Sequence, residues 1–235
     1  MITIITSLYN SDKYLKKYAE YIEKFSMYLK NKGVRHEFVI VSNDPNKKEL
    51  NELSQIKSNS NIDLNIIICP RETLYATWNR GIREAKYENI TFWNVDDQRF
   101  PEAIIDGLKN IENGSDIVYF PFLYKRYVRI LGLKILIKRK VINSIEYRSD
   151  LFLKGMYTGP FFIVKRHIFE VVGVFNDSFK IAGDFEWMTR ATKKSLLFKY
   201  TPTLAGIFTN DGNTLSGQKN SLQKLENKRI VDGIM

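Results

Sequence analysis

The 235-residue chain contains very few of the residues that build disulfide or zinc frameworks. It has one cysteine, Cys69, which excludes an internal disulfide, and its two histidines are too few for a zinc site of soft ligands. Any metal bound by this chain would therefore be held by oxygen atoms.

Long apolar runs are absent as well. No stretch of 18 or more residues is both apolar and uncharged, so the sequence does not predict a membrane-spanning helix. The first residues, MITIITSLYN, lack the basic region and cleavable apolar stretch of a signal peptide. We therefore expect a cytoplasmic protein.

Acidic residues are fewer than basic ones. The chain has 36 Lys and Arg against 26 Asp and Glu, a net charge of +10 that favours anionic partners. Residues 125–140, KRYVRILGLKILIKRK, contain seven basic residues and no acidic one. This segment is either a solvated face or an insertion that makes peripheral contact with the inner face of an anionic membrane. No nucleic-acid-binding module is recognisable, so we do not expect nucleic acid as a partner.

The first two thirds of the chain alternate between short apolar runs and segments with helical periodicity, which predicts an α/β fold. The order favours a mostly parallel, Rossmann-like sheet with helices on both faces. The predicted strands are 2–6, 37–42, 64–69, 89–93 and 116–121, and the predicted helices are 12–30, 47–57, 73–86 and 101–110.

The alternation stops after Pro121. We expect a strand and a short helix within residues 153–175, and a helix that begins after Gly183. From Gly206 onward the composition predicts a loop followed by a helix. Within it, residues 210–216 either contact a bound diphosphate or form a free tail.

Polar clusters follow three of the predicted strands: SLYN (7–10), SNDPN (42–46) and NVDDQR (94–99). Ligands of such sheets bind beyond the carboxyl ends of the strands, so these clusters should line one crevice. Asp96 and Asp97 suit a hard divalent cation that also binds phosphate oxygens. The alternative is that Asp97 caps the following helix and Asp96 is a solvated turn residue.

A second acidic cluster, AGDFEWMTR, occupies residues 182–190. The simplest interpretation makes Asp184 a helix N-cap and Glu186 a partner of the helix dipole. Residue types alone do not separate this from a catalytic role.

The segment LYATWNRGIREAKYENITFWNVDDQRFPEAI (74–105) resembles the central part of family 2 type glycosyltransferases, which have the GT-A fold. The similarity extends over residues 2–190 and includes TSLYN near the start and residues 159–175 before the second acidic cluster. The family motif D-x-D-D reads Asn94-Val95-Asp96-Asp97 here, and the second predicted strand is followed by Ser42-Asn43-Asp44 in place of the usual acidic pair.

The resemblance implies a site for a nucleoside diphosphate sugar. Asp97, assisted by Asp96, would hold Mn²⁺ or Mg²⁺, and Asp184 would be the general base of an inverting reaction. Acceptor contacts would come from Gly159, Glu186 and Trp187. Donor contacts would come from Ser7, Tyr9, Asn43, Asp44, Asn79, Asn94 and Asp96.

From these features we expect a metal-dependent inverting glycosyltransferase that acts in polysaccharide biosynthesis on a glycan or lipid-linked glycan acceptor. Residues 1–122 would form the half that binds the nucleotide sugar. Residues 123–205 would form the acceptor half, with a basic insertion at 123–148, and residues 206–235 would form a C-terminal loop and helix. The alternatives are a degenerate sugar-nucleotide-binding protein, suggested by Asn94 and Ser42, and a nucleotidyltransferase, although SLYNSDKYLKK lacks the glycines of a phosphate loop.

Overall fold

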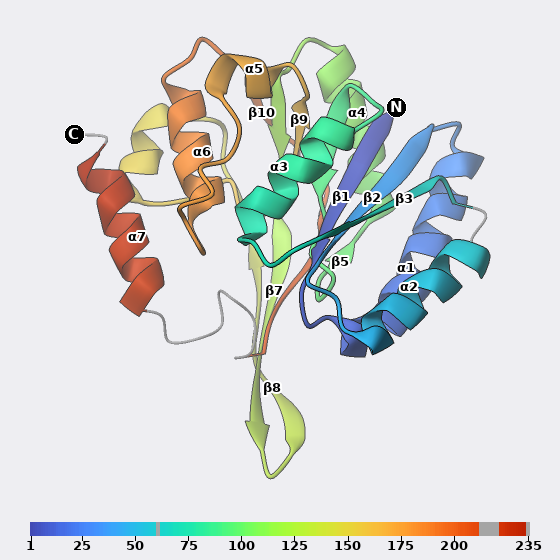
Figure 1. The fold of residues 1–235 in the computed structure, drawn as a ribbon. Helices are drawn as coiled ribbons and strands as arrows, with labels where there is room; N and C mark the ends of the chain where they lie inside the picture. The colour runs from blue at the N-terminus through green and yellow to red at the C-terminus, as the bar shows by residue number, and fades with distance from the viewer. Residues whose placement is uncertain (60–61, 212–220, 234–235) are drawn as a thin grey trace.

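The computed structural model describes residues 1–59, 62–211 and 221–233 (Figure 1). The strands are β1 (Ile2–Leu8), β2 (His36–Asn43), β3 (Leu64–Cys69), β4 (Asn89–Phe92), β5 (Gln98–Arg99), β6 (Ile117–Tyr119), β7 (Phe122–Ile130), β8 (Leu133–Ile142), β9 (Phe162–Lys165), β10 (Phe198–Tyr200) and β11 (Gly206–Asn210). The helices are α1 (Asp12–Asn31), α2 (Lys47–Asn59), α3 (Leu74–Glu84), α4 (Pro101–Glu112), the 3-10 helix η1 (Ser149–Lys154), α5 (Ile168–Val172), α6 (Gly183–Thr192) and α7 (Ser221–Asp232).

The central sheet has the strand order β10-β6-β9-β4-β1-β2-β3. Strand β1 runs parallel to both β2 and β4, and β3 runs parallel to β2, whereas β9 is antiparallel to its neighbours β4 and β6. This arrangement confirms the expected α/β fold with a mostly parallel sheet.

Each face of the sheet packs against its own set of helices, because side chains alternate along a strand. Ile4 belongs to a core that includes residues of α1, α2 and α4, whereas Ile5 belongs to a core that includes residues of α3, α5 and α6. Figure 1 shows α3 crossing in front of the sheet and α1 and α2 beside β2 and β3. Burial on both faces explains why the strands of the first half are almost continuously apolar.

Helix α3 lies unusually close to the central strand. A Cβ atom added at Gly81 would be 2.5 Å from Ile5 Cγ2, so only glycine allows this approach. The close packing fixes the height of α3 on β1, and with it the position of the first turn of α3, which faces the site described below.

A smaller sheet with the order β5-β11-β7-β8 stands beside the central one. Its β7 and β8 form an antiparallel hairpin, so the basic segment 125–140 is a pair of strands. Leu131 and Gly132 make the two-residue turn with φ angles of 49° and 82°. The expectation of a loop from Gly206 is wrong in part, because residues 206–210 are strand β11, while residues 212–216 lie outside the described residues.

Candidate functional site

Asp96 and Asp97 lie in a tight turn between β4 and β5. The backbone N–H of Asp97 donates to the carbonyl of Asn94 at 3.0 Å, and the indole Nε1 of Trp93 donates to the carbonyl of Asp97 at 3.1 Å. Trp93 is itself fully buried, packed between Tyr18 and Phe25. The core of the protein therefore fixes the backbone of the acidic turn.

The carboxylate of Asp97 is only 3% exposed and accepts a hydrogen bond of 2.8 Å from the backbone N–H of Thr209 in β11. It caps no helix, since α4 begins at Pro101 with Phe100 as its N-cap residue. Asp97 thus connects the end of β4 to the second sheet, and the helix-cap alternative is excluded.

The carboxylates of Asp96 and Asp97 are close enough to repel each other. Burial raises the pKa of Asp97 well above its ordinary value, and the charge of Asp96 raises it further, although the Thr209 N–H and Asn94 act in the opposite direction. Burial likewise raises the pKa of Asp96 to about 6, with a smaller contribution from Asp211. A cation bound here would lower both values, because it favours the ionised forms.

Two residues that sequence reasoning did not single out complete this region. Asp211, just after β11, is buried, and its Oδ2 lies 3.5 Å from Nζ of Lys134 in β8. The Lys134 ammonium also lies 4.4 Å from the ring centroid of Tyr127. The hairpin thus brings one positive charge to the acidic turn. The only indication of this contact in the sequence was the basic composition of residues 125–140.

The residues present suit a hard divalent cation. In the part of the chain that the structure describes, no group of three or more His, Cys, Asp or Glu side chains is arranged to hold a metal. Asp97 and Asp96 nevertheless offer the carboxylate oxygens that Mg²⁺ and Mn²⁺ prefer, and these ions commonly complete their coordination with water and phosphate oxygens. Relief of the repulsion between the two carboxylates would favour such binding.

The polar groups at the end of β1 and just after it lie at the same edge of the sheet. Ser7 Oγ accepts a hydrogen bond of 2.7 Å from Thr77 in the first turn of α3. Tyr9 is 42% exposed, and the guanidinium carbon of Arg71 lies 3.2 Å from the centroid of its ring. Tyr9 and Arg71 form an exposed aromatic and cationic pair that could stack against a base, and Arg71 was not anticipated from the sequence.

Two asparagines expected at the donor site hold the backbone together instead. The amide of Asn43 bonds both the N–H and the carbonyl of Glu72, and the amide of Asn79 bonds both the N–H and the carbonyl of Phe175. Asn79 is buried within this contact, so we do not carry its donor role forward. Asp44, in contrast, is exposed, with a φ angle of 51°.

Asp184 lies in the first turn of α6. It is not the N-cap, since that position belongs to Ala182. Its Oδ1 accepts hydrogen bonds from the hydroxyl of Tyr75 at 3.1 Å and from the N–H of Phe185 at 2.9 Å. Burial raises the pKa of Asp184, these two hydrogen bonds lower it, and the charge of Glu226 adds a smaller increase.

Glu226 of α7 holds the approach to α6 in place. Its carboxylate accepts hydrogen bonds of 2.9 to 3.0 Å from the backbone N–H groups of Lys180, Ile181 and Ala182. Sequence reasoning missed this residue, because nothing local marks a glutamate that pairs with backbone 44 to 46 residues away.

Tyr75 connects the end of β1 with the start of α6. It lies two residues before Thr77, which bonds Ser7 near the end of β1, and its own hydroxyl reaches both Asp184 and the carbonyl of Ile181. The first turn of α3 therefore brings Asp184 to the edge at which β1 to β4 end, where the Asp96–Asp97 turn also lies.

The expected acceptor residues have other surroundings. Trp187 is fully buried, packs against Phe162, Phe169 and Phe175, and donates its indole N–H to the carbonyl of Gly173. The prediction that Trp187 contacts an acceptor is wrong, because the side chain offers no accessible surface in this structure.

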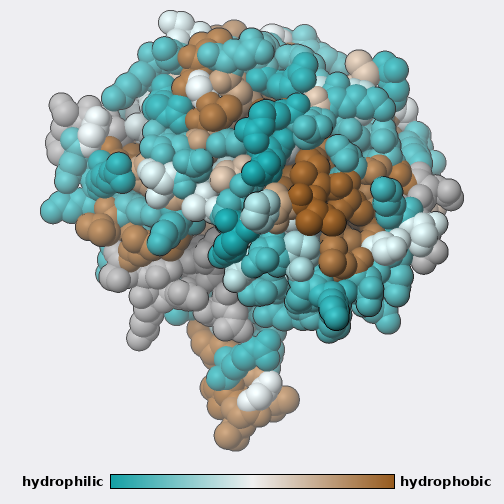
Figure 2. All heavy atoms as spheres, viewed as in Figure 1, coloured by the Kyte–Doolittle hydropathy of each residue, from teal (hydrophilic) through white to brown (hydrophobic). Residues whose placement is uncertain are grey.

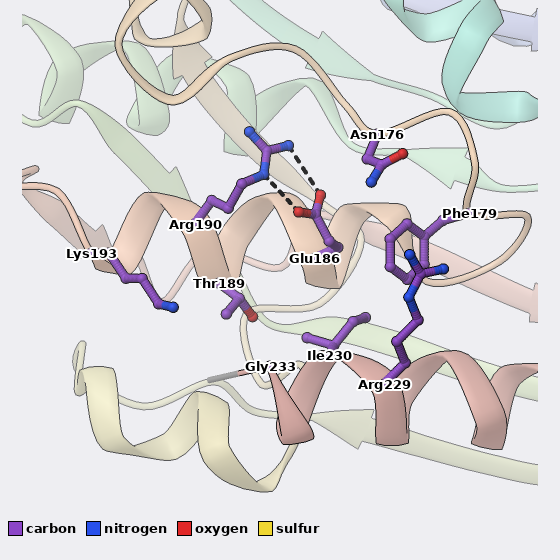
Figure 3. Close-up of a pocket in the computed structure, with 9 residues that line it drawn as sticks. All are labelled: Asn176, Phe179, Glu186, Thr189, Arg190, Lys193, Arg229, Ile230 and Gly233. Carbon is purple, nitrogen blue, oxygen red and sulfur yellow. Dashed lines mark hydrogen bonds and ion pairs between the residues drawn. The ribbon is translucent and has the colours of Figure 1, made fainter. Parts of the chain in front are cut away.

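Gly159 and Glu186 also have structural explanations. Gly159 has a φ angle of +71°, and a Cβ there would be 2.6 Å from the ring of Phe122. Glu186 forms a bidentate ion pair with Arg190 beside a pocket of about 230 Å³ between α6 and α7 (Figure 3). That pocket is lined by neither Asp97 nor Asp184, so we do not assign it to the candidate site.

Comparison with solved structures identifies the type of fold. The chain superposes on residues 1–349 of S. aureus TarS in complex with UDP with a TM-score of 0.70, over 99% of this chain and 64% of that chain, at 15% identity. The complex of the same protein with UDP-GlcNAc also gives 0.70, over 99% and 66%, at 16% identity. A mannosyltransferase, PcManGT from Pyrobaculum calidifontis in complex with GDP-Man and Mn²⁺, gives 0.63 over 88% and 56%, at 14% identity.

These neighbours are GT-A glycosyltransferases, and the present fold is therefore of the GT-A type. The model of glycosyl transferase family 2 matches residues 3–173, and the chain belongs to that family. Comparison with curated proteins gives no match. The chain spans about two thirds of the length of the TarS fragment.

Proposed function

We propose that this chain is an inverting glycosyltransferase that moves a sugar from a nucleoside diphosphate sugar to a hydroxyl group of a glycan or lipid-linked glycan. One observation carries the proposal: two carboxylates, the buried Asp97 and the half-buried Asp184, lie at the same edge of the sheet in different surroundings. Asp97 lies beside a second carboxylate, Asp96, and near the buried guanidinium of Arg99. Asp184 instead accepts a hydrogen bond from the hydroxyl of Tyr75. Family membership and the nucleotide-sugar complexes of the structural neighbours support the donor class.

The donor would lie across the ends of β1 and β4. In this proposal the Tyr9–Arg71 pair stacks against the base, and Asn94 hydrogen-bonds the ribose. Asp97, with Asp96, would hold Mn²⁺ or Mg²⁺, and such an ion supplies neutralisation of the charge that develops on the departing diphosphate. The Lys134 side chain places a further positive charge in the same region.

Asp184 would remove the proton from the acceptor hydroxyl. The hydrogen bonds from Tyr75 and Phe185 both go to Oδ1, which orients the carboxylate. We assign Oδ2 as the proton acceptor. As the proton moves to Oδ2, the acceptor oxygen bonds to the anomeric carbon and the bond from that carbon to the diphosphate oxygen breaks on the opposite face. A raised pKa makes Asp184 a stronger base than an ordinary aspartate once it is ionised.

The test is nucleotide release from a panel of UDP-, GDP- and dTDP-sugars with Mn²⁺ or Mg²⁺. We expect turnover with one donor, and loss of that turnover in Asp184→Asn but not in Asp177→Asn. Asp177 is an exposed carboxylate seven residues earlier and is therefore a matched control. Nucleotide binding without turnover for every donor, even with membrane extract as acceptor, would instead support a degenerate sugar-nucleotide-binding protein.

A further inference from the structure

The hairpin of β7 and β8 leaves the body of the protein. Figure 1 shows it projecting from the edge of the molecule opposite to the N-terminus, where β1 begins, so it extends beyond the carboxyl ends of the parallel strands. Every residue from 129 to 141 is exposed. Burial therefore does not explain why this part of the chain is rich in aliphatic side chains.

The pairing of the strands separates the side chains into two faces. Val128 pairs with Ile135 and Ile130 pairs with Leu133, so these four aliphatic side chains share one face. Arg129 pairs with Lys134 on the other face, which is the face from which Lys134 reaches Asp211. The aliphatic face is thus turned away from the acidic turn.

The end of the hairpin is the most exposed apolar part of the described protein surface. Leu131 is 98% exposed, Leu133 69% and Ile130 53%. Figure 2 shows the apolar tip below the largely hydrophilic body. A tip of this kind loses apolar contact with water only when another apolar phase receives it.

Basic residues surround this tip. Residues 125–140 contain seven Lys and Arg and no Asp or Glu, so this short segment accounts for seven of the ten net positive charges of the whole chain. Arg129 pairs with Lys134 directly behind the tip, and Arg126 pairs with Lys138 and Lys125 with Arg139 further toward the body. The order from tip to body is therefore apolar and then cationic.

We propose that the hairpin docks this protein on an anionic phospholipid bilayer. The aliphatic tip enters the boundary between headgroups and acyl chains, and the cationic pairs behind it contact the phosphate groups, which is the order of layers that an interface presents. A second copy of this chain fits poorly, because two such hairpins would bring two clusters of positive charge together. Nucleic acid would satisfy the charge but leaves the aliphatic tip without a function.

Docking through the hairpin would turn the edge that carries Asp97 and Asp184 toward the bilayer. That orientation suits an acceptor embedded in lipid. The inference goes beyond the proposed function, and it can fail independently, since vesicle association is measured without any sugar donor.

The experiment is co-sedimentation of the full chain with vesicles of phosphatidylcholine alone or with about 30% phosphatidylglycerol. We expect binding to the anionic vesicles only. The triple variant Arg126→Gln, Lys138→Gln, Arg139→Gln should weaken it about 100-fold, at about fivefold for each charge. A control variant with Lys16→Gln, Lys24→Gln and Lys57→Gln removes three exposed charges from α1 and α2 and should retain clearly stronger binding than the hairpin variant.

A second pair of variants tests the apolar tip. Leu131→Ser with Leu133→Ser should weaken vesicle binding about tenfold, whereas Leu197→Ser, a leucine of 63% exposure in the body, should not change it. In Leu133→Trp, the new indole would be the one exposed tryptophan, because Trp78, Trp93 and Trp187 are buried. Its fluorescence should shift to shorter wavelength with anionic vesicles and be quenched by brominated lipid.

Three results would overturn the proposal. The first is equal binding, or none, to neutral and anionic vesicles by a protein whose circular dichroism is that of a folded chain. The second is tight binding to RNA or DNA that the Leu131→Ser, Leu133→Ser change leaves intact, with no vesicle binding. The third is self-association in sedimentation velocity that this double change abolishes.

Discussion

Asp97 and Asp184 are the same chemical group, the first buried and the second half-buried, and burial raises the pKa of both. Their neighbours differ. Asp97 lies beside the carboxylate of Asp96 and near the guanidinium of Arg99, and its hydrogen-bond donors are a backbone N–H and an asparagine. Asp184 accepts from a tyrosine hydroxyl and lies near the carboxylate of Glu226, which three backbone N–H groups already satisfy. Burial alone therefore does not define the function of a carboxylate. The neighbours of Asp97 favour binding of a cation, and those of Asp184 favour acceptance of a proton.

The largest expected effect comes from Asp184→Asn. The variant should lose turnover by about 10²- to 10⁴-fold, because the amide cannot accept the proton. The variant should still bind the nucleotide. The measurement is nucleotide release under single-turnover conditions.

The same variant has an unusual expected effect on stability. The folded pKa of Asp184 is raised, so the ionised carboxylate is disfavoured in the folded state. The stability of the natural protein should therefore fall as the pH rises from the unfolded pKa of about 3.9 through the folded value. Asp184→Asn should lack this fall and be at least as stable at pH 7 by thermal denaturation. A clear loss of stability at pH 7 would contradict this account of the site.

Tyr75→Phe should have a smaller effect on rate, about tenfold, since it removes the group that orients Asp184 but leaves the base. The lost hydrogen bond favoured the ionised form, so the rising limb of kcat/KM should move to higher pH. Tyr87→Phe, at the opposite edge of the sheet, is the matched control. An unchanged pH profile in Tyr75→Phe would show that the two side chains are not coupled.

Glu226→Gln should move the rising limb of the kcat/KM pH profile in the opposite direction, and by less than Tyr75→Phe does. Burial is the main cause of the raised pKa of Asp184, and the Glu226 charge adds to it, so neutralising Glu226 should shift the limb to lower pH. Weaker hydrogen bonds to the segment before α6 should also cost about 1–3 kcal/mol of stability. Equal pH shifts in the same direction for Tyr75→Phe and Glu226→Gln would contradict the opposite effects that we assign to these two neighbours of Asp184.

Much of the fold follows from local pattern. The first four strands and four helices lie within about two residues of their predicted limits, because both sheet faces are covered and the apolar spacing is strong. Strand β11 was missed, since its pairing with β5 and β7 depends on residues about a hundred positions away and its own composition resembles a loop.

The site was predictable in its acidic residues and not in their partners. Asp96, Asp97 and Asp184 follow from the order of motifs along the chain. Tyr75 and Asp184 are 109 residues apart, and Lys134 and Asp211 are 77 apart, so no local spacing reveals these contacts. Trp187 was expected to contact an acceptor from the family resemblance, which does not show that this side chain packs inside the core.

The central claim is that the two carboxylates have different tasks, and binding measurements test it most directly. Titration calorimetry would give the affinity for the donor's nucleoside diphosphate with and without Mn²⁺ for the natural chain, Asp97→Asn and Asp184→Asn. We expect Asp97→Asn to abolish most of the Mn²⁺-dependent gain in affinity, by tenfold or more, and Asp184→Asn to keep it within about twofold. Equal losses in the two variants, or a loss in Asp184→Asn alone, would contradict the account.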